Sequence, residues 1–382
     1  GTKGFFWTPA QYLAEIPVLS SYGMNFLATC YGSFYKDYKF EKGNNNWWEP
    51  FNTDLQKEWK AVIEKSKEHE IMFCFGMNPM LYSAQPLDTE SEDDFKKLLA
   101  QYRWFQENGV KWFYLALDDL HMHKGMKVDG KEQALFTNKL YEALLKHDPE
   151  TKMIFCPTWY WGSTTKDPDK KAYLLEIAEY LRQDIPCFWT GNDIVATTVD
   201  KFDALEYKSI IGHELILWDN YPVNDFNNSL HLGPITGRDP RLNEVLYGIM
   251  GNPMRDNKMN RLPLFTMADY AHNPQKYNPS NSIVQAIKAI SENSFQEEVL
   301  KKLILFYPGD ITYRSKTTRI NCARVEFESL FSKNRDIAAE YLQLLIETEQ
   351  EFDKAFPNKY DDTKNVIKKD IQWMTTTLSN KK

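Results

Sequence analysis

The sequence predicts an α/β fold, a (β/α)8 TIM barrel followed by a smaller all-α C-terminal domain. Over the first two-thirds of the chain, short apolar runs alternate with longer amphipathic stretches, as in parallel strands joined by crossover helices. The length of 382 residues fits an eight-stranded barrel better than an open doubly wound sheet. The first apolar run is not followed by the Gly-x-Gly-x-x-Gly fingerprint of a dinucleotide-binding fold.

The apolar runs have the length and composition of strands that are buried on both faces. We predict strands over residues 4–8, 25–31, 71–77, 111–118, 152–158, 186–190 and 214–219. An eighth strand is expected over 244–251, although this run also fits a helical period. The amphipathic stretches predict helices over residues 9–22, 53–69, 89–107, 131–147, 170–182 and 199–208.

The alternation stops at a segment rich in Pro and Asn, residues 273–281. Helical patterns dominate beyond it, over residues 282–292, 295–306, 334–356 and 361–378. We therefore expect a barrel domain over 1–275 and a helical domain over 276–382. Ser282 or a neighbouring Asn is expected to cap the first helix of the second domain.

Composition and charge exclude several classes of function. The formal net charge of −7 argues against a nucleic-acid partner, because such proteins carry a basic stripe. The chain has no apolar stretch long enough to span a membrane, and its 5 cysteines include no Cys-x-x-Cys pair of a zinc or redox site. The 11 Trp, 21 Tyr and 23 Phe are suited to a cleft that binds sugar rings, which carry apolar C–H patches.

An acid pair follows the most apolar of the predicted strands. The run from Lys111 to Leu117 stops at Asp118 and Asp119. Residues at the carboxyl ends of barrel strands face the active site. Two adjacent carboxylates in a partly dry cleft cannot both ionise cheaply, so one is pushed toward the protonated form that a general acid needs.

Polar and aromatic residues also follow the next three predicted strands, at 157–162, 189–193 and 218–225. Each segment alone fits an ordinary turn, since Gly, Asn, Asp and Pro recur in turns for backbone reasons. Their convergence on one barrel face, together with the acid pair, predicts a single site.

Several of these segments, in their order and spacing, resemble the O-GlcNAcase and bacterial hyaluronidase-type β-N-acetylglucosaminidase family. The likeness covers roughly residues 4–285, and its most specific block is the one at 218–225. The matching motifs are Asp118-Asp119, Trp189-Thr190-Gly191-x-x-Ile194-Val195, Trp218-Asp219-Asn220-Tyr221-Pro222-Val223-Asn224-Asp225, His231-Leu232-Gly233-Pro234, Gly251-Asn252-Pro253-Met254 and Ala268-Asp269-Tyr270-x-x-Asn273-Pro274.

The resemblance implies a retaining glycoside hydrolase in which the acetamido oxygen of the sugar attacks the anomeric carbon and forms an oxazoline. The substrate would be a terminal β-linked N-acetylglucosamine or a close N-acetylhexosamine. By similarity, Asp118 orients and polarises the acetamide N–H. Asp119 protonates the leaving oxygen and later acts as base for the incoming water. Adjacent aspartates are poorly placed for the alternative, in which two carboxyls flank the scissile bond from separate elements.

The resemblance also implies a set of substrate-binding residues. Tyr160 would lie near the acetamido oxygen, Trp218 against its methyl group, and Asn220 in the same pocket. Asp225 and Asn252 would contact sugar hydroxyls. The full set is Gly4, Tyr160, Thr190, Ile194, Trp218, Asn220, Asp225 and Asn252, with Thr190 and Ile194 on the pocket wall.

The N-terminal segment departs from the family pattern. Trp7 stands in place of the second glycine of a Gly-Phe-Tyr-Gly opening. The turn after the second strand lacks the family Lys that binds a sugar hydroxyl, and Lys36 is the candidate replacement. These departures motivate an alternative, a diverged barrel that binds glycans without cleaving them. A pure binder, however, has no need of two costly adjacent carboxylates.

A metal site is the other alternative interpretation of the acid pair, because His121 and His123 follow it closely. A hydrolytic metal centre usually draws its ligands from several strands, so we expect no metal and no cofactor. The expected partner is a carbohydrate or glycoconjugate. The chain begins at Gly1 without an initiator Met. Since bacterial relatives are commonly exported, we expect a periplasmic or secreted protein whose signal has been removed.

Overall fold

The computed structural model describes residues 6–122, 125–162, 167–224, 229–255, 258–309, 311–314, 317–320 and 322–380. The chain divides into two compact units. The first comprises Gly1–Asn220 and Arg238–Met250, and the second comprises Tyr221–Gly237 and Gly251–Lys382. The boundary that the sequence predicts near residue 275 stays a prediction.

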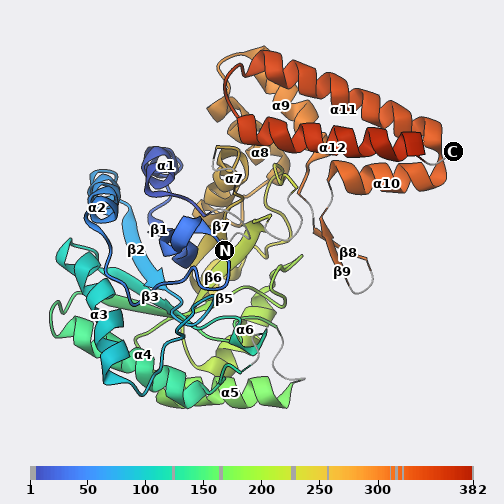
Figure 1. Ribbon diagram of the computed structural model, residues 1–382. Coiled ribbons are helices and arrows are strands. Elements are labelled where there is room, and N and C mark those ends of the chain that lie inside the picture. Colours follow the sequence, from blue (N-terminus) through green and yellow to red (C-terminus); the bar gives the residue numbers. More distant parts are fainter. Residues whose placement is uncertain are drawn as a thin grey trace. The chain divides into compact units, whose positions relative to one another are not determined.

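Seven strands form one sheet in the order of the chain, which curls into a nearly closed barrel (Figure 1). Neighbouring strands from β1 to β6 pair in parallel. The strands are β1 (Phe26–Ala28), β2 (Met72–Met77), β3 (Trp112–Ala116), β4 (Lys152–Cys156), β5 (Cys187–Trp189), β6 (Leu215–Pro222) and β7 (Leu246–Asn252). The predicted (β/α)8 fold class is confirmed.

One predicted strand is wrong in its described part. Residues 6–8 of the run 4–8 are not in a strand, and helix α1 begins directly after them, at Pro9. The backbone N–H of Phe6 donates to the Tyr38 carbonyl oxygen at 2.9 Å, so it bonds to a short 3-10 helix (Lys36–Tyr38) instead of a neighbouring strand. The run 244–251, which fitted both a strand and a helix, forms β7.

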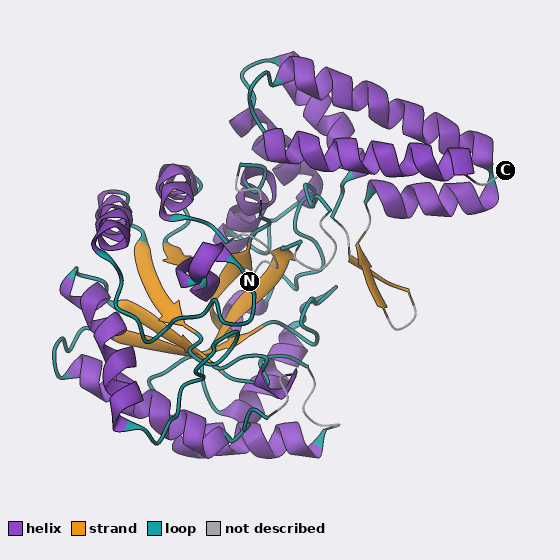
Figure 2. Ribbon diagram, viewed as in Figure 1, coloured by secondary structure: helices purple, strands orange, loops and turns teal. Residues whose placement is uncertain are grey.

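Helices cover the outside of these strands (Figure 2), and each strand from β1 to β5 is followed by one. They are α1 (Pro9–Ser21), α2 (Thr53–Glu68), α3 (Glu92–Glu107), α4 (Gly130–Leu145), α5 (Pro168–Tyr180) and α6 (Lys201–Ile211). The five from α2 to α6 begin after side chains that accept a hydrogen bond from the first turn, namely Asn52, Ser91, Asp129, Asp167 and Asp200. Such caps satisfy N–H groups that have no partner within the helix.

Alternate residues of the strands fill the barrel interior. Side chains from five neighbouring strands form one buried cluster, which includes Cys74, Tyr114, Ile154, Phe188 and Ile216. Because successive side chains of a strand point to opposite faces, the other residues of each strand face the surrounding helices. The interior cluster extends to aromatic residues beyond the strand ends, and these surround the acid pair described below.

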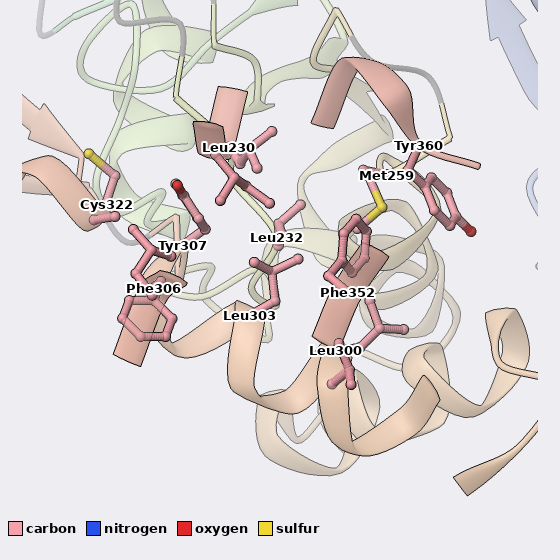
Figure 3. Close-up of a cluster of buried hydrophobic side chains, with 14 of the residues drawn as sticks. Leu230, Leu232, Met259, Leu300, Leu303, Phe306, Tyr307, Cys322, Phe352 and Tyr360 are labelled. Carbon is pink, nitrogen blue, oxygen red and sulfur yellow. The ribbon is translucent and has the colours of Figure 1, made fainter. Parts of the chain in front are cut away.

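The second unit is mainly helical, with α7 (Arg261–His272), α8 (Pro279–Ile290), α9 (Ser294–Phe306), α10 (Ala323–Lys333), α11 (Arg335–Ala355) and α12 (Asp361–Asn380). Figure 3 shows its core, where Leu230 and Leu232 lie with Leu300, Leu303 and Phe352. The sequence did not predict α7, α10 or the hairpin of β8 (Ile311–Arg314) and β9 (Thr317–Ile320). Asn278 caps α8, which begins at Pro279, ahead of the predicted start at residue 282, so the cap is an Asn as expected but lies earlier in the chain. None of the helices in the described ranges is long and apolar enough to cross a membrane.

Candidate active site

The acid pair lies at the carboxyl end of β3. Tyr114 and Ala116 point into the barrel interior, so Asp118 follows on the same face. Its side chain is buried. The backbone of Asp119 is left-handed, with φ of 61°. This conformation is uncommon outside glycine and best tolerated by Asp and Asn, and it is often found at functional sites. The two carboxyls therefore leave the chain in different directions.

Asp118 is held by residues from the two preceding strand ends. The Tyr31 hydroxyl donates to Oδ2 at 2.8 Å, and the Asn78 amide donates to Oδ1 at 2.9 Å. Tyr31 begins a short 3-10 helix after β1 (Tyr31–Phe34), and Asn78 directly follows β2. Burial raises the pKa of Asp118 above its usual value, while the two hydrogen bonds act in the opposite direction by stabilising the charged form.

Asp119 is held by a residue that follows β4. The Tyr160 hydroxyl donates to Oδ1 of Asp119 at 2.8 Å. Burial, followed by the nearby charge of Asp119, raises the pKa of Tyr160 well above its ordinary value. The phenol consequently stays protonated and remains a hydrogen-bond donor at any physiological pH. Asp119 itself is half-buried, in contrast to the buried Asp118.

Further predicted residues lie on the same interior face. Trp218 and Ile194 are half-buried against the interior cluster that contains Tyr160. The Trp218 ring makes an edge contact with Phe188, with ring centroids 5.0 Å apart. Asn220, two residues farther along β6, donates from Nδ2 to the Ile194 carbonyl oxygen at 2.6 Å. The structure thus brings Trp218 and Ile194 into the cluster that also contains Tyr160, and Asn220 ties Ile194 to β6.

Of the four remaining predicted residues, the structure describes two. Thr190 directly follows β5, is buried, and donates to the Asp193 carbonyl oxygen at 2.9 Å. Asn252 is the last residue of β7 and is buried. Gly4 and Asp225 lie outside the described residues. The roles assigned to all of these residues stay predictions.

The segment that departs from the family pattern packs as an aromatic cluster. Trp7 is buried and makes an edge contact with Tyr12. Lys36, the candidate replacement for the family Lys, is exposed. Phe40 stacks on Tyr82 at 4.7 Å between centroids, and both rings pack against the interior cluster. Aromatic surface therefore lies beside the residues that hold Asp118.

Tyr31 and Asn78 are the site residues that the sequence analysis missed. A signal was available, because Tyr31 ends the predicted strand 25–31 and Asn78 directly follows the predicted strand 71–77. Polar groups at carboxyl ends of neighbouring parallel strands converge in a barrel. The two aspartates are distinctive in the sequence because charged residues are unusual directly after an apolar run. Tyrosine and asparagine are common at such positions and therefore carry a weaker signal.

His121, one of the two histidines that raised the possibility of a metal, packs against aromatic rings. Its ring lies 4.0 Å from that of Trp159 between centroids and 5.1 Å from that of Trp161. Lys170 places its ammonium over both indoles. Across the described ranges, no three His, Cys, Asp or Glu side chains gather as a metal site, and His123 lies outside those ranges.

Comparison with known proteins identifies the family. The family model for beta-N-acetylglucosaminidase matches residues 3–306. Among solved structures, an O-GlcNAc hydrolase mutant of Thermobaculum terrenum superposes with a TM-score of 0.76 at 22% identity, over 99% of this chain and 81% of that one. CpGH84B superposes with a TM-score of 0.78 at 24% identity, over 99% of this chain and 66% of that one. These likenesses agree on the barrel fold, and the family match covers most of the chain. The chain belongs to the β-N-acetylglucosaminidase family of glycoside hydrolases.

Proposed function

We propose that this enzyme removes terminal β-linked N-acetylglucosamine, or a close N-acetylhexosamine, with retention of configuration by a substrate-assisted mechanism. The observation that carries the proposal is the unequal environment of two adjacent carboxyls. Asp118 is buried and held by Tyr31 and Asn78, whereas Asp119 is half-buried and turned aside by a left-handed backbone. Neighbouring acids in different surroundings can perform different tasks in one reaction.

Asp118 suits the task of orienting the acetamide. Each of its oxygens already accepts one hydrogen bond, and a carboxylate oxygen can accept two. A remaining lone pair can therefore accept the acetamide N–H of the sugar. This contact shifts electron density to the acetamido oxygen, which bonds to the anomeric carbon as the glycosidic C–O bond breaks. The product of this step is a protonated oxazoline, the oxazolinium ion, whose positive charge faces the Asp118 carboxylate.

Asp119 suits the task of moving the proton. In the first step its protonated carboxyl gives a proton to the leaving glycosidic oxygen. In the second step its carboxylate takes a proton from water, whose oxygen bonds to the anomeric carbon as the oxazoline opens and the acetamide is restored. Tyr160 orients this carboxyl through its hydroxyl. Trp218 offers an apolar face to the acetamido methyl group within the interior cluster.

The deciding experiment compares aryl glycosides that differ only in the sugar. We expect hydrolysis of the N-acetyl-β-glucosaminide, weaker or equal hydrolysis of the N-acetyl-β-galactosaminide, and none of the β-glucoside and β-galactoside, because these lack the attacking oxygen. Stepwise fluorination of the acetyl group weakens that oxygen as a nucleophile and should lower kcat at each step. Proton NMR should detect the β-anomer of the sugar as the first product. Hydrolysis of glycosides without an acetamide would contradict the mechanism.

Variants of the two aspartates separate their roles. Asp119→Asn should lose most activity on a substrate with a poor leaving group and retain more on a dinitrophenyl glycoside, whose departure needs no proton. Asp118→Asn should be impaired on both substrates, because oxazoline formation itself is slowed. Equal leaving-group dependence in the two variants would reject these assignments. Binding of glycan without turnover of any substrate would instead favour the non-catalytic alternative.

A further inference from the structure

A buried ion pair lies behind the site, on the outer face of β6. Arg238 contacts Asp219 with two parallel hydrogen bonds, Nε to Oδ2 at 2.7 Å and Nη2 to Oδ1 at 2.5 Å. The two side chains are only 5% and 2% exposed. Removing two charges from water is costly, and a buried pair is weak evidence for stability. The structural role of this ion pair therefore lies in the chain segments that it connects.

Asp219 is placed between two residues of the candidate pocket. Ile216 and Trp218 point into the barrel, and the alternation of a strand puts Asn220 on the same face and Asp219 on the opposite one. Asp219 is consequently not a group that contacts the sugar. Its carboxylate is available to fix the strand that carries Trp218 to whatever lies behind it.

Arg238 connects that strand to the β5–α6 loop, residues 190–200. Its Nη1 donates to the Thr197 carbonyl oxygen at 3.3 Å. Its backbone forms a parallel bridge with Val199, and the next N–H, that of Asp239, donates to the Val199 carbonyl oxygen at 2.9 Å. The far part of the β5–α6 loop is thus tied to Asp219 through one guanidinium.

The near part of the same loop is tied to β6 from the inner face. Asn220 donates to the Ile194 carbonyl oxygen at 2.6 Å, and Ile194 packs against the interior cluster. Two consecutive residues of β6 therefore hold one loop, Asn220 directly and Asp219 through Arg238. The held part is the segment between Thr190 and Val199, which carries the predicted pocket wall.

We propose that Asp219 and Arg238 are positioning residues that fix the distance between Trp218 and the Ile194 segment, and so set the length of the N-acyl group that the pocket accepts. The inference rests on the proposed function, because it takes these residues to enclose the acetamido group. A wall held from both faces of β6 keeps a fixed distance from Trp218 and limits the space for longer acyl chains. A loosened wall admits them.

The test measures kcat/KM for aryl β-glucosaminides that carry N-acetyl or N-butanoyl groups. In Asp219→Asn and Arg238→Lys, the ratio of butanoyl to acetyl activity should rise roughly tenfold, since a methylene or two in an apolar pocket is worth about that much discrimination. KM for the acetyl substrate should rise more than kcat falls. The matched control is Asp184→Asn, which breaks an exposed Arg182–Asp184 pair of the same chemistry and should leave the ratio unchanged.

The outcomes separate this inference from the function on which it rests. A wild-type enzyme that cleaves neither glucosaminide overturns the proposed function. A wild-type enzyme that cleaves the acetyl substrate, with variants that lose both activities by one common factor, overturns the positioning role alone. If a single variant does not fold, the double variant Asp219→Leu/Arg238→Met removes both charges and leaves no unpaired ion. An unchanged ratio in that variant would equally overturn the inference.

Discussion

At the scale of single residues, the site depends on the different burial and backbone conformation of Asp118 and Asp119. Asp118 continues the inward face of β3 and is desolvated, whereas Asp119 turns away through a left-handed backbone. Tyr31 and Asn78 from one side, and Tyr160 from another, then fix the two carboxyls. The raised pKa of Asp118 shows that burial outweighs the two hydrogen bonds to its charged form.

The variant Asp118→Asn should therefore be less active yet more stable at neutral pH. An acid whose pKa is raised by folding stabilises the folded state below its unfolded pKa and loses that contribution as pH rises through the folded pKa. Asparagine removes the cost of burying the charge and can still accept from Asn78 and donate to Tyr31. We expect a higher unfolding midpoint than wild type at pH ~7, a gap that closes below pH ~4, and activity reduced roughly a hundredfold or more. A lower midpoint at neutral pH would contradict this account.

Tyr160→Phe should slow catalysis. The variant loses the hydrogen bond to Asp119, and a hydrogen bond to a charged group is worth about 1.5–3 kcal/mol, so kcat/KM should fall roughly tenfold to a hundredfold. Because the pKa of Tyr160 is raised well above its ordinary value, the wild-type phenol remains a hydrogen-bond donor from pH 5 to pH 9. Tyr247→Phe, at a tyrosine that is 60% exposed, is the control. Wild-type activity in Tyr160→Phe would show that this hydrogen bond does not position Asp119.

At the scale of elements, the barrel strands interlock through one glycine. Gly76 in β2 has no side chain, and the ring of Tyr114 from β3 fills that space, since a Cβ at Gly76 would lie 2.1 Å from the ring. The Tyr114 hydroxyl then donates to the Thr29 carbonyl oxygen beyond β1 at 2.7 Å. Three consecutive strands are thereby joined across the interior, just below the residues that hold Asp118.

Gly76→Ala should destabilise the fold, whereas Gly248→Ala should not. The added methyl group in β2 must displace a buried tyrosine, and overpacking of this kind costs about 1–3 kcal/mol or more. Gly248 in β7 has open space where its Cβ would lie, so alanine there should change stability by less than about 0.5 kcal/mol. Denaturant unfolding of the two variants measures the difference. Equal midpoints would show that Tyr114 can move without cost.

The sequence patterns predicted most of these elements, and the failures have physical causes. Residues 4–8 are bulky and apolar enough for a strand, but a run of this length does not reveal whether its N–H groups meet a strand or a loop. Helix α7 was missed because Pro263 interrupts the helical pattern, although proline is tolerated in a first turn. Tyr31 and Asn78 were missed because their role arises only when separate strand ends meet around Asp118.

At the scale of the whole molecule, the chain consists of two compact units, and each contains a buried histidine. His213 in the first unit and His231 in the second each place Nδ1 2.9 Å from a carbonyl oxygen. Burial lowers the pKa of both, to about 4 for His231.

We propose the division at residue 275 as the functional boundary between barrel and helical domains, to be tested by limited proteolysis of the full chain.

Acid should destabilise the protein through these histidines. A histidine whose pKa is lowered by folding contributes stability above its unfolded pKa of about 6.5, and this contribution is lost as pH falls through the folded value. For His231 the loss reaches up to about 3 kcal/mol at low pH. We expect the free energy of unfolding to fall between pH ~6.5 and pH ~4, and His231→Gln to flatten that slope. A slope that the substitution leaves unchanged would assign the acid sensitivity elsewhere.

The left-handed backbone at Asp119 restricts how this enzyme can evolve or be engineered. Glycine, asparagine and aspartate adopt that geometry most readily, and of these three only aspartate has a carboxyl that can donate a proton. Glutamate, the next longer acid, would carry its carboxyl one methylene farther from the chain and so away from the hydroxyl of Tyr160 that holds Asp119. The proposal that Asp119 carries the proton therefore implies that exchanging this acid for another requires a rebuilt turn after β3.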